Sequence, residues 1–342
     1  MEIREAIVAV VAGRDLSQHQ AAEVMETIMA GSATPAQIGA LLTALHLKGE
    51  TDAELAGMAE VMRRKATVVI ADGPVVDTCG TGGDGSLSFN ISTTAAFVVA
   101  GAGLTVAKHG NRAMSSVCGS ADVLEALGVR IEMNASAVAR CLREAGIGFM
   151  FAPSFHPAMR FAGPVRREIG IRTAFNILGP LTNPAQARHQ VLGAASVPLA
   201  EKLARTLDRL DTVHALVVHG DGGMDELTLS GTNLIVEVRH GHPISSYEFT
   251  PEDVGLARAP QAALRGGDVL VNTAIVRGIL EGSDTGPRRD VVLLNAAAAL
   301  IAGDKATSLK EGIALARASI DEGYALERLE RLIAVSHATL HD

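Results

Sequence analysis

Two polar stretches in the first third of the sequence have the residue types that bind an anion. The first, Asp77-Thr-Cys-Gly-Thr-Gly-Gly-Asp-Gly85, is dense in glycine, and the second, Lys108-His-Gly-Asn-Arg112, is basic. Each follows a short apolar segment that we predict to be a strand, and an apolar run from Ile91 to Ala102 predicts a helix after the first. Glycines let backbone N–H groups converge, and a helix start adds free N–H groups and a positive dipole end. We therefore favour a polyphosphate cleft between neighbouring strand ends over an ordinary glycine turn.

A pair of adjacent carboxylates lies on another glycine-flanked loop. Asp225 and Glu226 follow a predicted strand, Ala215 to Val218, after the loop sequence His219-Gly-Asp-Gly-Gly-Met224. Such a pair is either a solvated turn or a site for a hard cation, and taken alone the turn is the commoner outcome. A polyphosphate cleft nearby favours the cation, because Mg²⁺ binds through one or two carboxylates together with phosphate oxygens.

A third group of candidates is basic. Arg166 and Arg167 lie in the string Pro164-Val-Arg-Arg-Glu168, ahead of the segment 170–184. A solvated helix face paired with Glu168 explains Arg167. Arg166 is better explained as a carboxylate-binding residue if its side of the helix faces the cleft, because a planar guanidinium is the usual partner of a carboxylate.

The elements that must position these residues predict an α/β protein. Residues 1–70 have helical spacing of apolar residues throughout, with capping boxes that begin at Ser17, Thr34 and Thr51. From Thr67 strands, loops and helices alternate, residues 227–250 alternate like antiparallel strands, and the remainder is helical. We expect a small all-α N-terminal domain over 1–70, which part of 165–190 could join. The larger domain, 71–342, would have a mostly parallel central sheet flanked by helices.

Composition excludes several classes of protein. The 342 residues carry a formal charge of -8, and this charge argues against nucleic acid as a partner. No run approaches the roughly 18 apolar residues of a membrane helix, and no signal peptide begins the chain, so we expect a cytoplasmic protein that does not bind membranes. The three cysteines give neither a disulfide framework nor a metal spacing.

These motifs also resemble those of a known family. The segments Gly80-Thr-Gly-Gly-Asp84, Asn90-Ile-Ser-Thr93 and Lys108-His-Gly-Asn-Arg112, with Ser115-Ser116, resemble the signature of the anthranilate phosphoribosyltransferases, and the resemblance extends over nearly the whole chain. It implies transfer of a phosphoribosyl group from phosphoribosyl pyrophosphate to the amine of anthranilate, in tryptophan biosynthesis. A pyrimidine nucleoside phosphorylase of the same fold is the alternative, but that family binds an uncharged base and lacks the string around Arg166. A non-catalytic phosphate-binding or nucleotide-binding regulator is a third hypothesis.

The resemblance also implies roles for individual residues. Phosphoribosyl pyrophosphate would contact Gly80, Gly83, Asp84, Ser88, Asn90, Ile91, Ser92, Thr93, Lys108, His109, Gly110, Asn111, Arg112, Ala113, Met114, Ser115, Ser116 and Ser120. Anthranilate would contact Gly80, Asn111, His156 and Arg166. Asp225 and Glu226, with Ser92, would hold Mg²⁺, with two ions in each subunit of a homodimer. Lys108 would act in catalysis, and His109 would act either as a base or as a structural donor.

Overall fold

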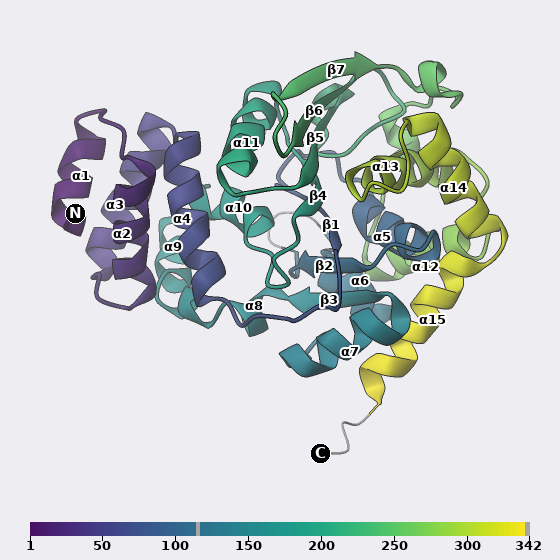
Figure 1. Ribbon diagram of the computed structural model, residues 1–342, viewed down its shortest axis with the longest axis horizontal. Helices are drawn as coiled ribbons and strands as arrows, with labels where there is room; N and C mark the ends of the chain where they lie inside the picture. The colour runs from purple at the N-terminus through teal and green to yellow at the C-terminus, as the bar shows by residue number, and fades with distance from the viewer. Residues whose placement is uncertain (114–116, 339–342) are drawn as a thin grey trace.

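The N-terminal region is a bundle of helices. A computed structural model describes residues 1–113 and 117–338. Its first four helices are α1 (Ile3–Val11), α2 (Gln18–Met29), α3 (Pro35–Lys48) and α4 (Asp52–Lys65), which form one end of the molecule (Figure 1). The capping boxes predicted at Ser17, Thr34 and Thr51 are confirmed, since each hydroxyl accepts a hydrogen bond from the backbone N–H three residues later.

The rest of the chain is built on one sheet. Its strands are β1 (Val76–Gly80), β2 (Val106–Gly110), β3 (Ile147–Phe151), β4 (His189–Gly193), β5 (His214–Gly220), β6 (Asn233–Arg239) and β7 (Ser245–Phe249). Their order across the sheet is β3-β2-β1-β4-β5-β6-β7. The pairs from β3 to β5 are parallel, and β6 and β7 continue the sheet as two antiparallel strands. The predicted mostly parallel sheet is therefore confirmed.

Helices cover both faces of this sheet. Apart from three helices near the N-terminal bundle, the helices of this domain are α5 (Ile91–Gly101), α6 (Ser120–Ala126), α7 (Ala135–Ala145), α11 (Val197–Arg209), α12 (Val269–Leu280), α13 (Pro287–Ala302), α14 (Leu309–Asp321) and α15 (Tyr324–His337). Side chains such as Leu216 and Val218 on β5 pack with α5 and α13 in one hydrophobic core. The alternate residues Ala215 and Val217 face a second core, which contains α11 and the N-terminal helices.

Three short helices lie near the N-terminal bundle. They are α8 (Ala152–Phe155), α9 (Gly163–Ile169) and α10 (Ala174–Leu178). Helix α9 contacts α3, and α10 contacts both α3 and α4, so the segment that carries Arg166 packs on the bundle side of the molecule (Figure 1). In the part of the chain that the structure describes, no helix is long and apolar enough to cross a membrane.

The topology identifies one edge of the sheet as the place for a ligand. On one side of β1 lie β2 and then β3, and on the far side of its neighbour β4 lie β5, β6 and β7. The strand order therefore reverses between β1 and β4. In open α/β sheets the crevice for a ligand lies beyond the carboxyl ends of the strands at such a switch point. The glycine-rich stretch leaves β1 at this edge, and the Asp225–Glu226 loop leaves β5 at the same edge.

Two local predictions were wrong. Lys108, His109 and Gly110 do not form a loop but complete β2, where His109 pairs in register with Met150 of β3. Pairing with a buried neighbour extends the strand past the point where the sequence becomes polar. Strand was expected from residue 227, with a turn at Ser230-Gly231. The turn is present, closed by hydrogen bonds between Thr228 and Asn233, but residues 227–229 are not strand and β6 begins only at Asn233.

Candidate active site

The Asp225–Glu226 loop lies across the carboxyl edge of the sheet, over glycines that end three strands. Gly80 of β1 and Gly193 of β4 are register partners, and Gly220 ends β5. A Cβ atom at Gly80 would collide with the Asp225 carboxylate, one at Gly193 with the Asp225 backbone carbonyl, and one at Gly220 with the Glu226 carbonyl. These glycines are required because another backbone approaches them closely.

Hydrogen bonds join this loop to the glycine-rich stretch and to the start of α5. The N–H of Gly82 donates to Asp225 Oδ2 at 2.6 Å, and the N–H of Asp225 donates to Asp84 Oδ2 at 3.4 Å. The N–H of Ser92, in the first turn of α5, donates to Glu226 Oε1 at 3.1 Å. First-turn N–H groups have no partner within the helix, so they are available to an anion. The two loops predicted from sequence to bind diphosphate and metal therefore lie in contact.

The two carboxylates are costly to ionise in this environment. Burial raises the pKa of Asp225 to about 7, and the nearby Asp84 carboxylate adds to the effect. Burial likewise raises the pKa of Glu226 to about 8, with repulsion from Asp225 second. A bound cation would stabilise both ionised forms, so the pair fits a metal. Within residues 1–113 and 117–338 no cluster of three or more His, Cys, Asp or Glu side chains could hold a metal by itself. A hard cation here would need further oxygen ligands from substrate and water, as Mg²⁺ usually does.

Lys108 lies beneath the loops rather than in one of them. Its Nζ donates to the carbonyl oxygen of Thr78 at 2.6 Å, and the residue is 3% exposed. Burial lowers the pKa of Lys108, while the carboxylates of Asp77 and Glu226 oppose that shift. Asp77 is itself buried and accepts from Asn183 Nδ2 at 2.8 Å. A buried cation thus lies among the strand ends and is held by its neighbours.

Two buried, neutral histidines lie close together, one in β2 and one shortly after β3. The rings of His109, in β2, and His156, after α8, have centroids 5.0 Å apart. Burial lowers the pKa of His109 to about 3 and that of His156 to about 4. Each ring has a backbone hydrogen bond, His109 with Gly179 and His156 with Thr182, while among the described residues neither Nε2 has a partner. Both Nε2 atoms therefore present a free lone pair.

Two threonine hydroxyls add to this set of unpartnered polar atoms. Thr81 Oγ1, in the glycine-rich stretch, and Thr173 Oγ1, before α10, are buried and have no hydrogen-bond partner in the described ranges. Buried polar groups are nearly always hydrogen-bonded in folded proteins, and each exception needs an explanation. Hydrogen bonds to a bound substrate would explain these four atoms. The sequence analysis singled out neither threonine, and Thr81 was visible only as part of the glycine motif.

Arg166 is a half-buried cation in α9. Its guanidinium stacks 5.1 Å from the centroid of the Phe175 ring. Burial is the only cause that lowers its pKa, and no carboxylate of the described chain offsets it. An arginine held against an aromatic ring without an acidic partner is available for an incoming carboxylate.

The predicted residues of the second basic stretch have partners of their own. Arg112 donates to Asp122 at 3.1 Å and to Glu125 at 2.8 Å, and these carboxylates, Glu125 foremost, raise its pKa. Ser120 Oγ donates to the carbonyl of Asn111 at 3.3 Å. In this structure the guanidinium of Arg112 is therefore directed at α6 rather than left unpaired.

The remaining predicted residues flank the start of α5. Asn90 Nδ2 donates to the carbonyl of Cys118 at 3.2 Å, and Asn90 Oδ1 accepts from Asn272 at 3.1 Å. Ser88 Oγ accepts from Ser86 Oγ at 3.2 Å. Ile91 and Thr93 are buried in the first turn of α5, and Ala113 N–H donates to Asp122. Met114, Ser115 and Ser116 lie outside the described residues.

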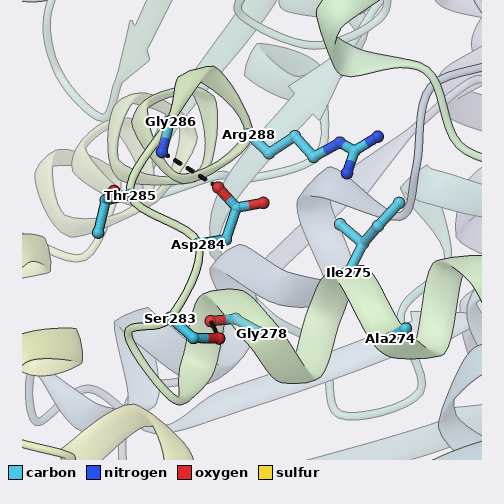
Figure 2. A pocket seen from close by; sticks show the side chains of 8 residues that line it. All are labelled: Ala274, Ile275, Gly278, Ser283, Asp284, Thr285, Gly286 and Arg288. Carbon is cyan, nitrogen blue, oxygen red and sulfur yellow. Dashed lines mark hydrogen bonds between the residues drawn. The ribbon is translucent and has the colours of Figure 1, made fainter.

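A pocket elsewhere contains none of the predicted residues. Figure 2 shows it between α12 and the start of α13. It is lined by Ala274, Ile275, Gly278, Ser283, Asp284, Thr285, Gly286 and Arg288. Its acidic residue, Asp284, accepts from the N–H of Gly286 at 3.1 Å, so the loop is held by its own contacts. The sheet edge remains the better candidate because it combines buried charges with unpartnered polar atoms.

Comparisons with known proteins agree with this geometry. Two glycosyl transferase family models match, the a/b domain over residues 72–326 and the helical bundle domain over residues 4–66. The anthranilate phosphoribosyltransferase of Chloroflexus aggregans is 77% identical over 336 residues, which are 98% of this chain and 99% of that protein. The crystal structure of the Thermus thermophilus anthranilate phosphoribosyltransferase is 48% identical, with a TM-score of 0.92 over 97% of this chain and 99% of that one. The Saccharomyces cerevisiae enzyme in complex with PRPP and Mg is 26% identical, with a TM-score of 0.88 over 98% and 97% of the two chains.

Proposed function

We propose, because this chain belongs to the anthranilate phosphoribosyltransferase family, that it transfers the phosphoribosyl group of 5-phosphoribosyl 1-pyrophosphate to the amine of anthranilate. The products are N-(5-phosphoribosyl)anthranilate and pyrophosphate, and the reaction serves tryptophan biosynthesis. The observation that carries the proposal is the contact of the glycine-rich loop, the start of α5 and the buried Asp225–Glu226 pair at one sheet edge. Those are the parts that a leaving diphosphate requires.

The diphosphate half-site follows from how charge moves in the reaction. As the bond to the leaving group breaks, the ribose becomes cation-like and the diphosphate gains negative charge, so preorganised donors lower the barrier. The N–H groups of Gly82 and Ser92 hold the carboxylates of Asp225 and Glu226. The other N–H groups of the glycine-rich loop and the buried Lys108 would supply positive potential to the diphosphate. Mg²⁺, when bound, would neutralise charge on the diphosphate. Asp225, Glu226 and Ser92 would hold it, and we propose two ions per subunit.

The acceptor half-site has to orient an amine that is already nucleophilic. The lone pair of an aromatic amine is free at neutral pH, so positioning contributes more than deprotonation before attack. Arg166 would bind the carboxylate of anthranilate. The free Nε2 atoms of His109 and His156 would accept hydrogen bonds from its N–H groups. With a pKa near 3, His109 is a poor proton store, so we assign it this acceptor role rather than that of a general base.

The transfer is tested by the fluorescence of anthranilate. The signal should fall only when enzyme, Mg²⁺ and phosphoribosyl pyrophosphate are all present, and pyrophosphate should appear in equal amount. A pyrimidine nucleoside phosphorylase would instead release ribose 1-phosphate from a nucleoside when phosphate is added, and would leave anthranilate unchanged. Binding of the sugar pyrophosphate without turnover would point to the regulator hypothesis.

We also propose the domain division and the homodimer that the sequence predicts. The helical bundle model ends at residue 66 and the a/b domain model begins at residue 72, which supports a division between 1–70 and 71–342. The packing of α9 and α10 on α3 and α4 supports adding part of 165–190 to the helical unit. Val8, Val11 and Leu47 are 63%, 71% and 80% exposed on the neighbouring helices α1 and α3. Exposed apolar side chains on adjacent helices suit a surface that a second copy covers. A cytoplasmic location stays a prediction from sequence.

A further inference from the structure

Arg172 connects the two half-sites, although neither the sequence motifs nor the proposed chemistry uses it. It lies between α9 and α10, the two helices that pack on the N-terminal bundle, and six positions after Arg166. Its side chain leaves that segment and reaches the glycine-rich loop beyond β1. One residue thus spans from the segment assigned to the acceptor to the loop assigned to the diphosphate.

The guanidinium binds the loop through two successive carbonyl groups. Nη2 donates to the carbonyl oxygen of Thr81 at 3.3 Å and to that of Gly82 at 3.1 Å. A Cβ atom at Gly83 would collide with the guanidinium, so only glycine leaves room for this contact. Gly82 and Gly83 both have positive φ, 65° and 74°, which glycine adopts without strain. In the described part of the chain no carboxylate pairs with Arg172.

Holding these carbonyls also fixes the direction of the N–H groups. In a planar trans peptide the C=O and the N–H point in opposite directions. The carbonyl of Thr81 shares its peptide plane with the N–H of Gly82, and the carbonyl of Gly82 shares its plane with the N–H of Gly83. When Arg172 binds both carbonyls, both N–H groups must point away from it. The N–H of Gly82 does so and donates to Asp225 at 2.6 Å.

We infer that Arg172 is a positioning residue that couples the two substrate half-sites, so that diphosphate bound at the loop tightens the binding of anthranilate. An anion bound to the N–H of Gly83 would add to the hold that Asp225 has on the N–H of Gly82, and both carbonyls would stay directed at Arg172. Arg172 would then order the segment that carries Arg166. Coupling of this kind is a shared free energy and acts equally in both directions. The inference rests on the proposed function, because that function assigns the two half-sites.

The test measures the coupling itself. Anthranilate is titrated into the full-length enzyme and its dissociation constant is obtained from its fluorescence, first alone and then with saturating Mg²⁺ and pyrophosphate. These additions fill the diphosphate half-site without turnover. In the native enzyme we expect binding to tighten by about fivefold or more, the lower end of typical couplings. In R172A the ratio should fall to about one, whereas a residue with only a structural role would leave the ratio unchanged.

Two further variants keep the test decisive. R167A removes an exposed arginine of the same segment and should keep the native ratio. R172K keeps the charge, but its ammonium ends one bond short of the position of Nη2, which donates to both carbonyls. It should therefore also lower the ratio, and it replaces R172A if that variant folds poorly. A native ratio of one, or a native-like ratio in R172A, overturns the inference. Phosphoribosyl transfer by the native preparation is measured alongside, because loss of transfer would count against the proposed function and a changed ratio would not.

Discussion

The glycine at the end of β4 offers a sharp test of how the Asp225–Glu226 loop is positioned. In Gly193→Ala the new Cβ would meet the backbone of Asp225, which cannot turn aside as a side chain can. The φ of Gly193 is not positive, so contact rather than backbone strain is what changes. Overpacking of this kind costs about 1–3 kcal/mol, and we expect the loop to move to relieve it.

The size of the kinetic effect follows from the bond that this movement breaks. Asp225 accepts the Gly82 N–H at 2.6 Å, and a hydrogen bond to a charged group contributes about 1.5–3 kcal/mol. Losing that energy in the transition state lowers kcat/KM for phosphoribosyl pyrophosphate by about 10-fold to 150-fold. The KM for anthranilate should change less, because among the described residues no hydrogen bond or ion pair joins the displaced loop to Arg166.

Steady-state kinetics at saturating anthranilate, together with thermal unfolding, measure both effects. Gly73→Ala is the matched control, since nothing lies within 4 Å of a Cβ there and φ is again not positive. We expect it to keep native kinetics. If Gly193→Ala retained the native kcat/KM and Tm, the close approach of the loop to β4 would be wrong.

Three further predictions follow from the same contacts. Asp225→Asn combined with Glu226→Gln should raise the Mg²⁺ concentration for half-maximal activity by about tenfold or more, because a pair of buried carboxylates is replaced by neutral groups; an unchanged Mg²⁺ titration would contradict the metal assignment. The pKa of His156 is about 4 in the folded protein and about 6.5 in the unfolded chain, so the unfolded chain takes up the proton more readily. The free energy of unfolding is therefore unaffected by this group above pH 6.5 and falls as the pH drops from 6.5 toward 4. On going from pH 7 to pH 5, native protein should therefore lose about 2 kcal/mol more unfolding free energy than His156→Gln, and parallel losses in denaturant titrations would refute this. Val8→Asp with Leu47→Asp should convert a dimer to monomers in light scattering if the α1–α3 surface pairs two copies, and a native mass that already equals one chain would exclude the dimer.

The elements of the fold were predictable where local signals were strong. In the capping boxes at Ser17, Thr34 and Thr51 the hydroxyl and its Gln or Glu partner are three residues apart, and that pattern depends on no distant contact. The parallel sheet followed from the alternation of strand and helix. The end of β2 was missed because Lys108 and His109 look like loop residues until pairing with β3 buries them.

The motifs of the site were predictable from the sequence, but the residues that position those motifs were not. The loops of β1 and β5 could be recognised by glycine and carboxylate spacing, whereas their contact depends on Gly193 and Gly220, which look like ordinary strand ends in the sequence. Arg172 was passed over for the same reason. Its partners are backbone carbonyls ninety residues away, and such a contact leaves no pattern near the arginine. A role that depends on a contact with a distant stretch of backbone can be recognised only in the three-dimensional structure.

The most direct test of the account compares both substrates in Arg166→Ala. Within residues 1–113 and 117–338, Arg166 has no acidic partner, and its half-buried guanidinium is held on Phe175. We predict that its loss raises the KM for anthranilate at least tenfold while the KM for phosphoribosyl pyrophosphate stays within about twofold, since a charge-assisted bond contributes roughly 1.5–3 kcal/mol. Equal increases for the two substrates, or an unchanged KM for anthranilate, would contradict the placement of the acceptor and with it the central claim.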